Sequence, residues 1–316
     1  MEETVEWLLE GPPYVRYRTE VDLLGKGDCG DSRSEMLSHK GVRELVDECR
    51  NWPGPPVKRH NDSKLLLHKL CFLSELGLNE NDPWIEEICE SAMGDQDPDG
   101  PFRIRTILNE RYGGSGREQS AWYLCDAPTV VYSLAKLGWK GDERVLDARN
   151  HLLSLVHENG WRCAVSSELG KFRGPGRKTA ECPYANLVML KMISAFPDLI
   201  NGSEAGKGIS ALCDLWTERK VRRPFLFAMG TDFMKLKAPM IWYNILHVTE
   251  VLSRFPGARK DERFLQMVDI IRDKADDNGR YTAESIYLSW AGWDFSRKKE
   301  PSPWITYRVL NILKRL

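Results

Sequence analysis

The sequence predicts an all-α fold, an α/α toroid in which about six pairs of helices close into a ring. Three observations lead to this prediction. A glycine turn recurs at a regular interval, two kinds of apolar pattern alternate between the turns, and the last helix of the 316-residue chain lacks a sequential partner.

The recurring turn consists of a polar stretch, a glycine, and an aromatic residue reached directly or through one more residue. It reads "DQDPDGPF", "HENGW" and "DDNGRY", with the glycines at Gly100, Gly160 and Gly279. Gly160 follows Gly100 by 60 residues, and Gly279 follows Gly160 by 119 residues, which is close to two such steps. A fixed interval of this kind is the signature of a repeat architecture.

Two kinds of helix alternate between the turns. Segments such as "ECPYANLVMLKMISAFP" are apolar on most faces, which predicts inner helices that are buried on both sides. Segments such as "DERVLDARNHLLSLV" have an apolar stripe at helical spacing and a charged opposite face, which predicts outer helices. Because neither kind can bury its apolar face alone, neighbouring pairs must stack.

Inner helices are predicted to start near residues 13, 61, 122, 181, 240 and 302. The last has no outer partner before Leu316, and the segment "ETVEWLLE" near the start of the chain can take that place. We therefore expect the N-terminal helix to pack beside the C-terminal helix. On this basis, residues 1–316 form a single toroid domain.

Composition narrows the range of partners. The 45 Lys and Arg residues balance 46 Asp and Glu residues, so no net field attracts nucleic acid. The acidic start "MEETVEWLLE" is unlike a signal peptide, and no apolar run reaches the length of a membrane span. We expect a cytoplasmic protein with no stable membrane insertion and with reduced cysteines, and a protein partner is compatible with the sequence.

The stretch "QDPDGPF" at 96–102, with "HENGW" and "DDNGRY" as weaker copies, resembles the glutamine–glycine–tryptophan repeat of the squalene–hopene cyclase toroids. The resemblance extends to the protein prenyltransferase β-subunits and implies a degenerate terpenoid cyclase-like toroid. The D-x-D-D motif of the cyclases is missing, since the equivalent helix start reads "LCDAPT" with the single acid Asp126. A partner carboxylate is what keeps such an acid protonated, so its absence argues against cyclisation.

The prenyltransferase resemblance also implies a zinc ion held by Asp, Cys and His. The candidate ligands are Asp126, Cys182 and His247, and the repeat places the first two at the same level of adjacent inner helices. Asn244 stands where the resemblance would place histidine, and His247 follows three residues later. Zinc is therefore a hypothesis, and its alternative is a buried thiol with a hydrogen-bonded interior histidine.

The starts of the inner helices also supply candidate substrate-binding residues. Aromatic faces there would offer apolar area to an isoprenoid, a carbocation or a sugar ring. The candidates are Arg16, His60, Trp122, Tyr123, Tyr184, Asn186, Trp242, Tyr243, Asn244 and Trp304.

Three functions remain open, and the residues do not decide whether the chain is an enzyme. The first is an aromatic-lined cavity that binds, and in some form transforms, an isoprenoid-like or other apolar small molecule. The second is a carbohydrate-active (α/α)6 barrel enzyme with Asp62 and Asp126 as acid and base. The third is a non-catalytic helical-repeat scaffold.

Overall fold

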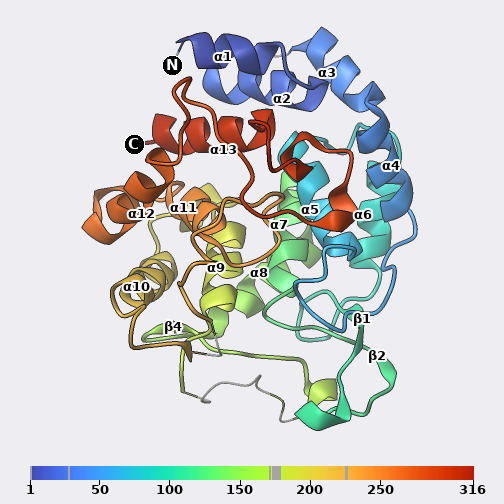
Figure 1. Ribbon diagram of the computed structural model, residues 1–316. Helices are drawn as coiled ribbons and strands as arrows, with labels where there is room; N and C mark the ends of the chain where they lie inside the picture. The colour runs from blue at the N-terminus through green and yellow to red at the C-terminus, as the bar shows by residue number, and fades with distance from the viewer. Residues whose placement is uncertain (1, 28, 171, 173–178, 225–226) are drawn as a thin grey trace. The chain divides into compact units, whose positions relative to one another are not determined.

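The computed structural model describes residues 2–27, 29–170, 172, 179–224 and 227–316. These residues are mainly α-helical, with two small antiparallel sheets of two strands each (Figure 1). The predicted all-α class of paired helices is confirmed. Within the described residues, no helix combines the length and the apolar character needed to cross a membrane.

Contacts divide the chain into two compact units, Met1–Leu45 with Met229–Leu316 (unit 1), and Val46–Ala228 (unit 2). One toroid domain over residues 1–316 therefore stays a prediction. Helix α4 (Lys40–Cys49) crosses the boundary between the units.

Unit 1 joins the two ends of the chain. Its helices are α1 (Glu2–Leu9), α2 (Pro13–Arg18), α3 (Gly30–Ser38), α11 (Ile245–Leu252), α12 (Glu262–Arg272) and α13 (Pro303–Lys314). Helix α1 packs against α2 and α13, as Figure 1 shows at the blue and red ends of the chain. The Thr4 hydroxyl also donates to the carbonyl oxygen of Asn278 at 3.1 Å. The predicted pairing of the N-terminal and C-terminal helices is thus present.

Unit 2 contains three helix pairs and both sheets. Its elements are α5 (Leu66–Leu76), α6 (Ile85–Met93), β1 (Ile104–Ile107), β2 (Glu118–Ala121), α7 (Ala127–Leu137), α8 (Glu143–Ser154), β3 (Val156–His157), β4 (Gly160–Trp161), α9 (Pro183–Ile193) and α10 (Ser203–Thr217). Every residue of α5 and α9 is buried, whereas α8 buries only one stripe. Helix α7 packs against both α5 and α9. The distinction between inner and outer helices therefore follows the apolar pattern.

The backbone conformation of the recurring turn explains why it contains glycine. Gly100, Gly160 and Gly279 all have a positive φ, at 112°, 94° and 71°. A Cβ at Gly160 would lie 2.3 Å from Oδ1 of Asn186. That side chain accepts from the backbone N–H of Trp161 and donates to its carbonyl oxygen, so it fixes the turn to α9. Any larger residue would break this attachment.

Candidate functional site

The strongest polar cluster lies in unit 2, where the starts of α5, α7 and α9 meet. His60 precedes α5, Asp126 is the N-cap residue of α7, and Cys182 is the N-cap residue of α9. Nδ1 of His60 lies 2.8 Å from Oδ2 of Asp126. Because α7 contacts both neighbouring helices, the three helix starts bring these side chains to one place.

The side chain of Asp126 does not cap helix α7, although it occupies the N-cap position. An N-cap carboxylate normally accepts a hydrogen bond from an N–H group of the first helical turn. Asp126 makes no such bond, and its Oδ2 instead faces His60. The residue is completely buried, and its Oδ1 has no hydrogen-bond partner among the described residues. A buried carboxylate oxygen left in this state is costly, which marks the group as a functional candidate.

His60 contacts this buried carboxylate and is itself partly exposed to solvent. Its side chain is 26% exposed, and its ring packs edge-on against Tyr123 with centroids 4.9 Å apart. Burial lowers the pKa of His60, but the charge and hydrogen bond of Asp126 outweigh it and leave the pKa above its ordinary value. The contact with Asp126 thus favours the protonated form of His60.

His68 of α5 holds the backbone of His60 in place. Its Nε2 lies 2.8 Å from the carbonyl oxygen of His60, so the nitrogen donates the hydrogen bond. Burial lowers the pKa of His68 to about 4. The pKa values of these two histidines are thus shifted in opposite directions.

Two thiols belong to the same cluster. The neighbouring Cys125 thiol lowers the pKa of Cys182 against the opposing effect of burial. The backbone N–H groups of Ala185 and Tyr184, in the first turn of α9, lower it further. The neighbouring Cys182 thiol and burial raise the pKa of Cys125. The pKa values of the two thiols are thus shifted in opposite directions.

The other predicted site residues of unit 2 have structural contacts. The hydroxyl groups of Tyr123 and Thr106 are 3.0 Å apart, and burial raises the pKa of Tyr123 to about 12. Trp122 packs edge-on against His151, and Tyr184 is buried. Asp62 is exposed and accepts from the backbone N–H of Lys64.

The remaining candidates lie in unit 1. Arg16 donates to Glu35 and to the carbonyl oxygen of Leu9. Trp304 packs against Tyr14 and Tyr307. Asn244 caps α11 by accepting from the backbone N–H of His247, while Trp242 is partly exposed and Tyr243 is buried against Phe233. The predicted substrate-binding residues are divided between the two units, so a shared aromatic cavity stays a prediction.

The three predicted zinc ligands are divided between the two units, so the zinc site stays a prediction. Among the residues that the structure describes, no group of three or more His, Cys, Asp or Glu side chains is arranged to hold a metal ion. Asp126 and Cys182 do occupy adjacent helix starts in unit 2. His247 belongs to unit 1, where its Nδ1 lies 3.1 Å from the carbonyl oxygen of Trp242.

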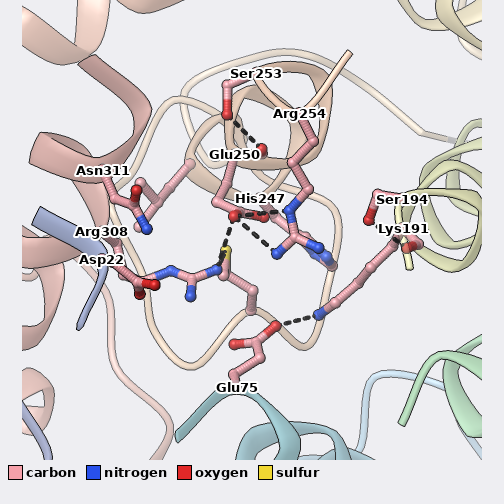
Figure 2. A network of polar contacts seen from close by, with 12 residues as sticks. Asp22, Glu75, Lys191, Ser194, His247, Glu250, Ser253, Arg254, Arg308 and Asn311 are labelled. Carbon is pink, nitrogen blue, oxygen red and sulfur yellow. Dashed lines mark hydrogen bonds and ion pairs between the residues drawn. The ribbon is translucent and has the colours of Figure 1, made fainter. Parts of the chain in front are cut away.

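Charged side chains are paired on the inner helices of both units (Figure 2). In unit 1, Glu250 of α11 lies 2.8 Å from Arg254 and 3.1 Å from Arg308 of α13. In unit 2, Lys191 of α9 lies 2.6 Å from Glu75 of α5, and both are almost fully buried. Inner helices with buried ion pairs differ from the continuous apolar lining that an isoprenoid pocket requires.

A cavity of about 520 Å³ opens beside the first glycine turn. Its lining residues are Gln96, Asp97, Pro98, Asp99, Gly100, Asp147, Asn150 and His151. The Asp97 carboxylate accepts from the backbone N–H of Asp99 and from Nε of Arg103. These contacts show that Asp97 stabilises the turn.

Comparisons with known proteins give one weak structural match. No family model matches the chain, and no curated protein is similar to it at a significant level. Among solved structures, a GH76 alpha-mannanase from Bacteroides thetaiotaomicron aligns over 81% of this chain and 68% of its own, with 13% sequence identity and a TM-score of 0.43.

This match is to an (α/α)6 glycosidase and corrects the family expectation. The assignment as a terpenoid cyclase-like or prenyltransferase-like protein is wrong. The motif that suggested it has a local cause, because Gly100, Gly160 and Gly279 have a positive φ, which glycine adopts readily. A turn motif of that kind identifies helix-pair geometry and not a reaction.

Proposed function

We propose that the chain is a carbohydrate-active enzyme whose reaction centre contains Asp126, with His60 beside it and Asp62 as the second carboxylate. The observation that carries this proposal is the state of Asp126. Its carboxylate is buried, makes no cap bond and keeps one oxygen without a hydrogen-bond partner in the described part of the chain. A group that contributes nothing to helix capping is available for chemistry.

Glycoside hydrolysis uses two carboxyl groups in different environments. One protonates the leaving oxygen, and the other acts as a base toward water or as a nucleophile. Asp126 is buried against His60, whereas Asp62 is exposed two residues after His60. This difference in burial gives the pair the asymmetry that acid and base roles require. His60 positions the Asp126 carboxylate through the contact between its Nδ1 and Oδ2.

The ion pairs of the inner helices support a polar substrate over an isoprenoid-like one. Pairs such as Glu75–Lys191 and Glu250–Arg308 are buried on these helices, and a sugar can offer hydrogen bonds near such groups while a hydrocarbon cannot. The solved neighbour named above is an alpha-mannanase. We therefore include α-mannan among the glycans to be tested.

The proposal is tested by incubating the purified chain with a panel of α- and β-linked glycans and measuring the release of reducing ends. We expect hydrolysis of one glycan class, and a loss of about 10²–10⁴-fold in rate for Asp126→Asn or Asp62→Asn. Asp269→Asn is the matched control, because this exposed carboxylate of α12 should leave the rate unchanged. Thermal melting of each variant checks the fold. A parent chain that cleaves no glycan, or an Asp126→Asn variant with full activity, would contradict the proposal.

A further inference from the structure

Arginine side chains gather around one carboxylate of α11 in unit 1. Oε1 of Glu250 accepts from Nη2 of Arg254 at 2.8 Å and lies 3.1 Å from Arg308 (Figure 2). The same oxygen accepts from Nη1 of Arg315 at 3.2 Å. Arg308 belongs to α13 and Arg315 is its C-cap residue, so about two helical turns separate them and place them on one face. Three guanidinium groups thus share a single carboxylate oxygen.

The charges of these four groups do not balance. Three guanidiniums and one carboxylate together carry a net charge of +2. Glu250 is only 1% exposed and Arg308 only 5%, so solvent screens their charges weakly. Burial lowers the pKa of Arg315, and the charges of Arg254 and Arg308 oppose the effect of Glu250, which raises it. An anion bound beside the cluster would offset this excess of positive charge.

The carboxylate of Asp22 does not neutralise the arginines around Glu250, although Figure 2 draws it with the same network. Arg18 donates to both oxygens of Asp22, at 2.8 and 2.6 Å, and Tyr307 donates to one of them. Asp22 therefore has an arginine of its own, and the excess charge around Glu250 is unchanged.

Ser253 holds two arginines in place at the solvent side of the cluster. Its hydroxyl oxygen accepts from Nη1 of Arg315 at 2.9 Å, and its carbonyl oxygen accepts from Nε of Arg259 at 2.7 Å. In the part of unit 1 that the structure describes, Arg315 donates only through Nη1 and Arg259 only through Nε. Both side chains are partly exposed, so their other N–H groups can donate to a ligand from solvent.

We propose that Arg259 and Arg315 bind a phosphate group, and that the two other arginines of the cluster supply further positive charge. A phosphate monoester carries close to two negative charges at neutral pH, which matches the charge of the cluster. The planar edge of a guanidinium can donate two parallel hydrogen bonds to such an oxyanion. Glu250 has a positioning role, because it holds together arginines that would otherwise repel one another. The carbohydrate chemistry proposed above concerns unit 2, so the two proposals are independent.

A phosphate group can reach this site as the free ion or as an ester. Isothermal titration calorimetry of the purified full-length chain compares inorganic phosphate with glucose 6-phosphate, in buffers brought to equal ionic strength with chloride. We expect saturable binding at one site per chain. Tighter binding of glucose 6-phosphate would support an ester as the ligand, and tighter binding of inorganic phosphate would support the free ion.

Variants connect this binding to the arginines. Arg315→Gln and Arg259→Gln should each weaken the binding by about 10-fold or more, because each removes charge-assisted hydrogen bonds to the phosphate oxygens. Arg272→Gln is the matched control, since this exposed arginine of α12 does not contact Glu250 or Ser253 and should leave the affinity unchanged. Thermal melting checks the fold of each variant.

A measurement on the parent chain covers the case in which a variant does not fold. Phenylglyoxal modifies accessible arginines, and peptide mass spectrometry locates the modified residues. Phosphate should slow the modification of Arg259 and Arg315 but not that of Arg272. The proposal is overturned if neither phosphate compound binds, if Arg315→Gln binds as tightly as the parent, or if phosphate protects all three arginines equally. Glycan cleavage is not a readout here, so a failure of either proposal can be recognised separately.

Discussion

The surroundings of two histidines near the start of α5 shift their pKa values in opposite directions. His60 has a carboxylate 2.8 Å away, and its pKa is raised. His68 is buried and faces a carbonyl oxygen, and its pKa falls to about 4. An unfolded histidine titrates near 6.5, so the two residues change the free energy of unfolding with pH in opposite directions. His60 contributes stability that is present below pH 6.5 and lost as the pH rises through its folded pKa.

His68 gives the first stability prediction. Between pH 6.5 and about 4, the unfolded chain binds a proton at this residue and the folded chain does not, so stability falls as the pH falls. We expect the parent to lose about 3 kcal/mol more than His68→Gln across this window, measured by urea unfolding at each pH. His157→Gln, at an exposed histidine of β3, should show a much smaller difference. Equal pH profiles for the parent and His68→Gln would show that His68 is not held neutral.

The sequence could supply the residue types of the candidate site but not their pairing. Asp126, Cys182 and His60 were each predicted at inner helix starts, because proline and polar residues mark those positions. Contact between His60 and Asp126 depends on the path of an irregular loop before α5, for which no periodicity exists. The effect of Cys125 on the pKa of Cys182 could not be predicted, because it depends on how α7 packs against α9. The place of Cys125 beside Asp126 in "LCDAPT" was the one available hint.

At the scale of elements, the apolar pattern predicted which helices are inner and which are outer. It also predicted that the N-terminal and C-terminal helices pack together. Helix α5 is buried at all positions, and α12 buries one stripe that includes Phe264 and Met267. Side-chain periodicity alone determines this distinction. The small sheets could not be predicted in the same way, because β3 and β4 have two residues each and β1 has four. Such strands are too short for an alternating pattern.

Helix α1 provides the second stability prediction. Leu8 is completely buried where α1 meets α2 and α13, so Leu8→Ala should reduce the free energy of unfolding by about 2–5 kcal/mol. Glu6 is on the exposed face of the same helix, and Glu6→Ala should stay within about 0.5 kcal/mol of the parent. Urea denaturation measures both. If the two variants are equally stable, α1 does not contribute to the packing of unit 1.

At the scale of the whole molecule, the units do not follow the order of the sequence. Unit 1 combines the first 45 residues with the last 88, from 229 to 316, while unit 2 is continuous. Residues far apart in the chain therefore share one set of packing contacts, as α1 and α13 do. Local opening usually involves such contiguous packing units as a group.

This organisation predicts which other helices are destabilised when α1 is altered. In Leu8→Ala, hydrogen–deuterium exchange should increase in α13, which packs on α1 although almost the whole chain separates them in sequence. Exchange in α5 and α7 of unit 2 should increase much less, because these helices pack with each other and with α9. An increase limited to α1 would mean that this helix frays alone. An equal increase in all these helices would mean that the two units unfold together, since only a single cooperative transition exposes unrelated contacts to the same extent.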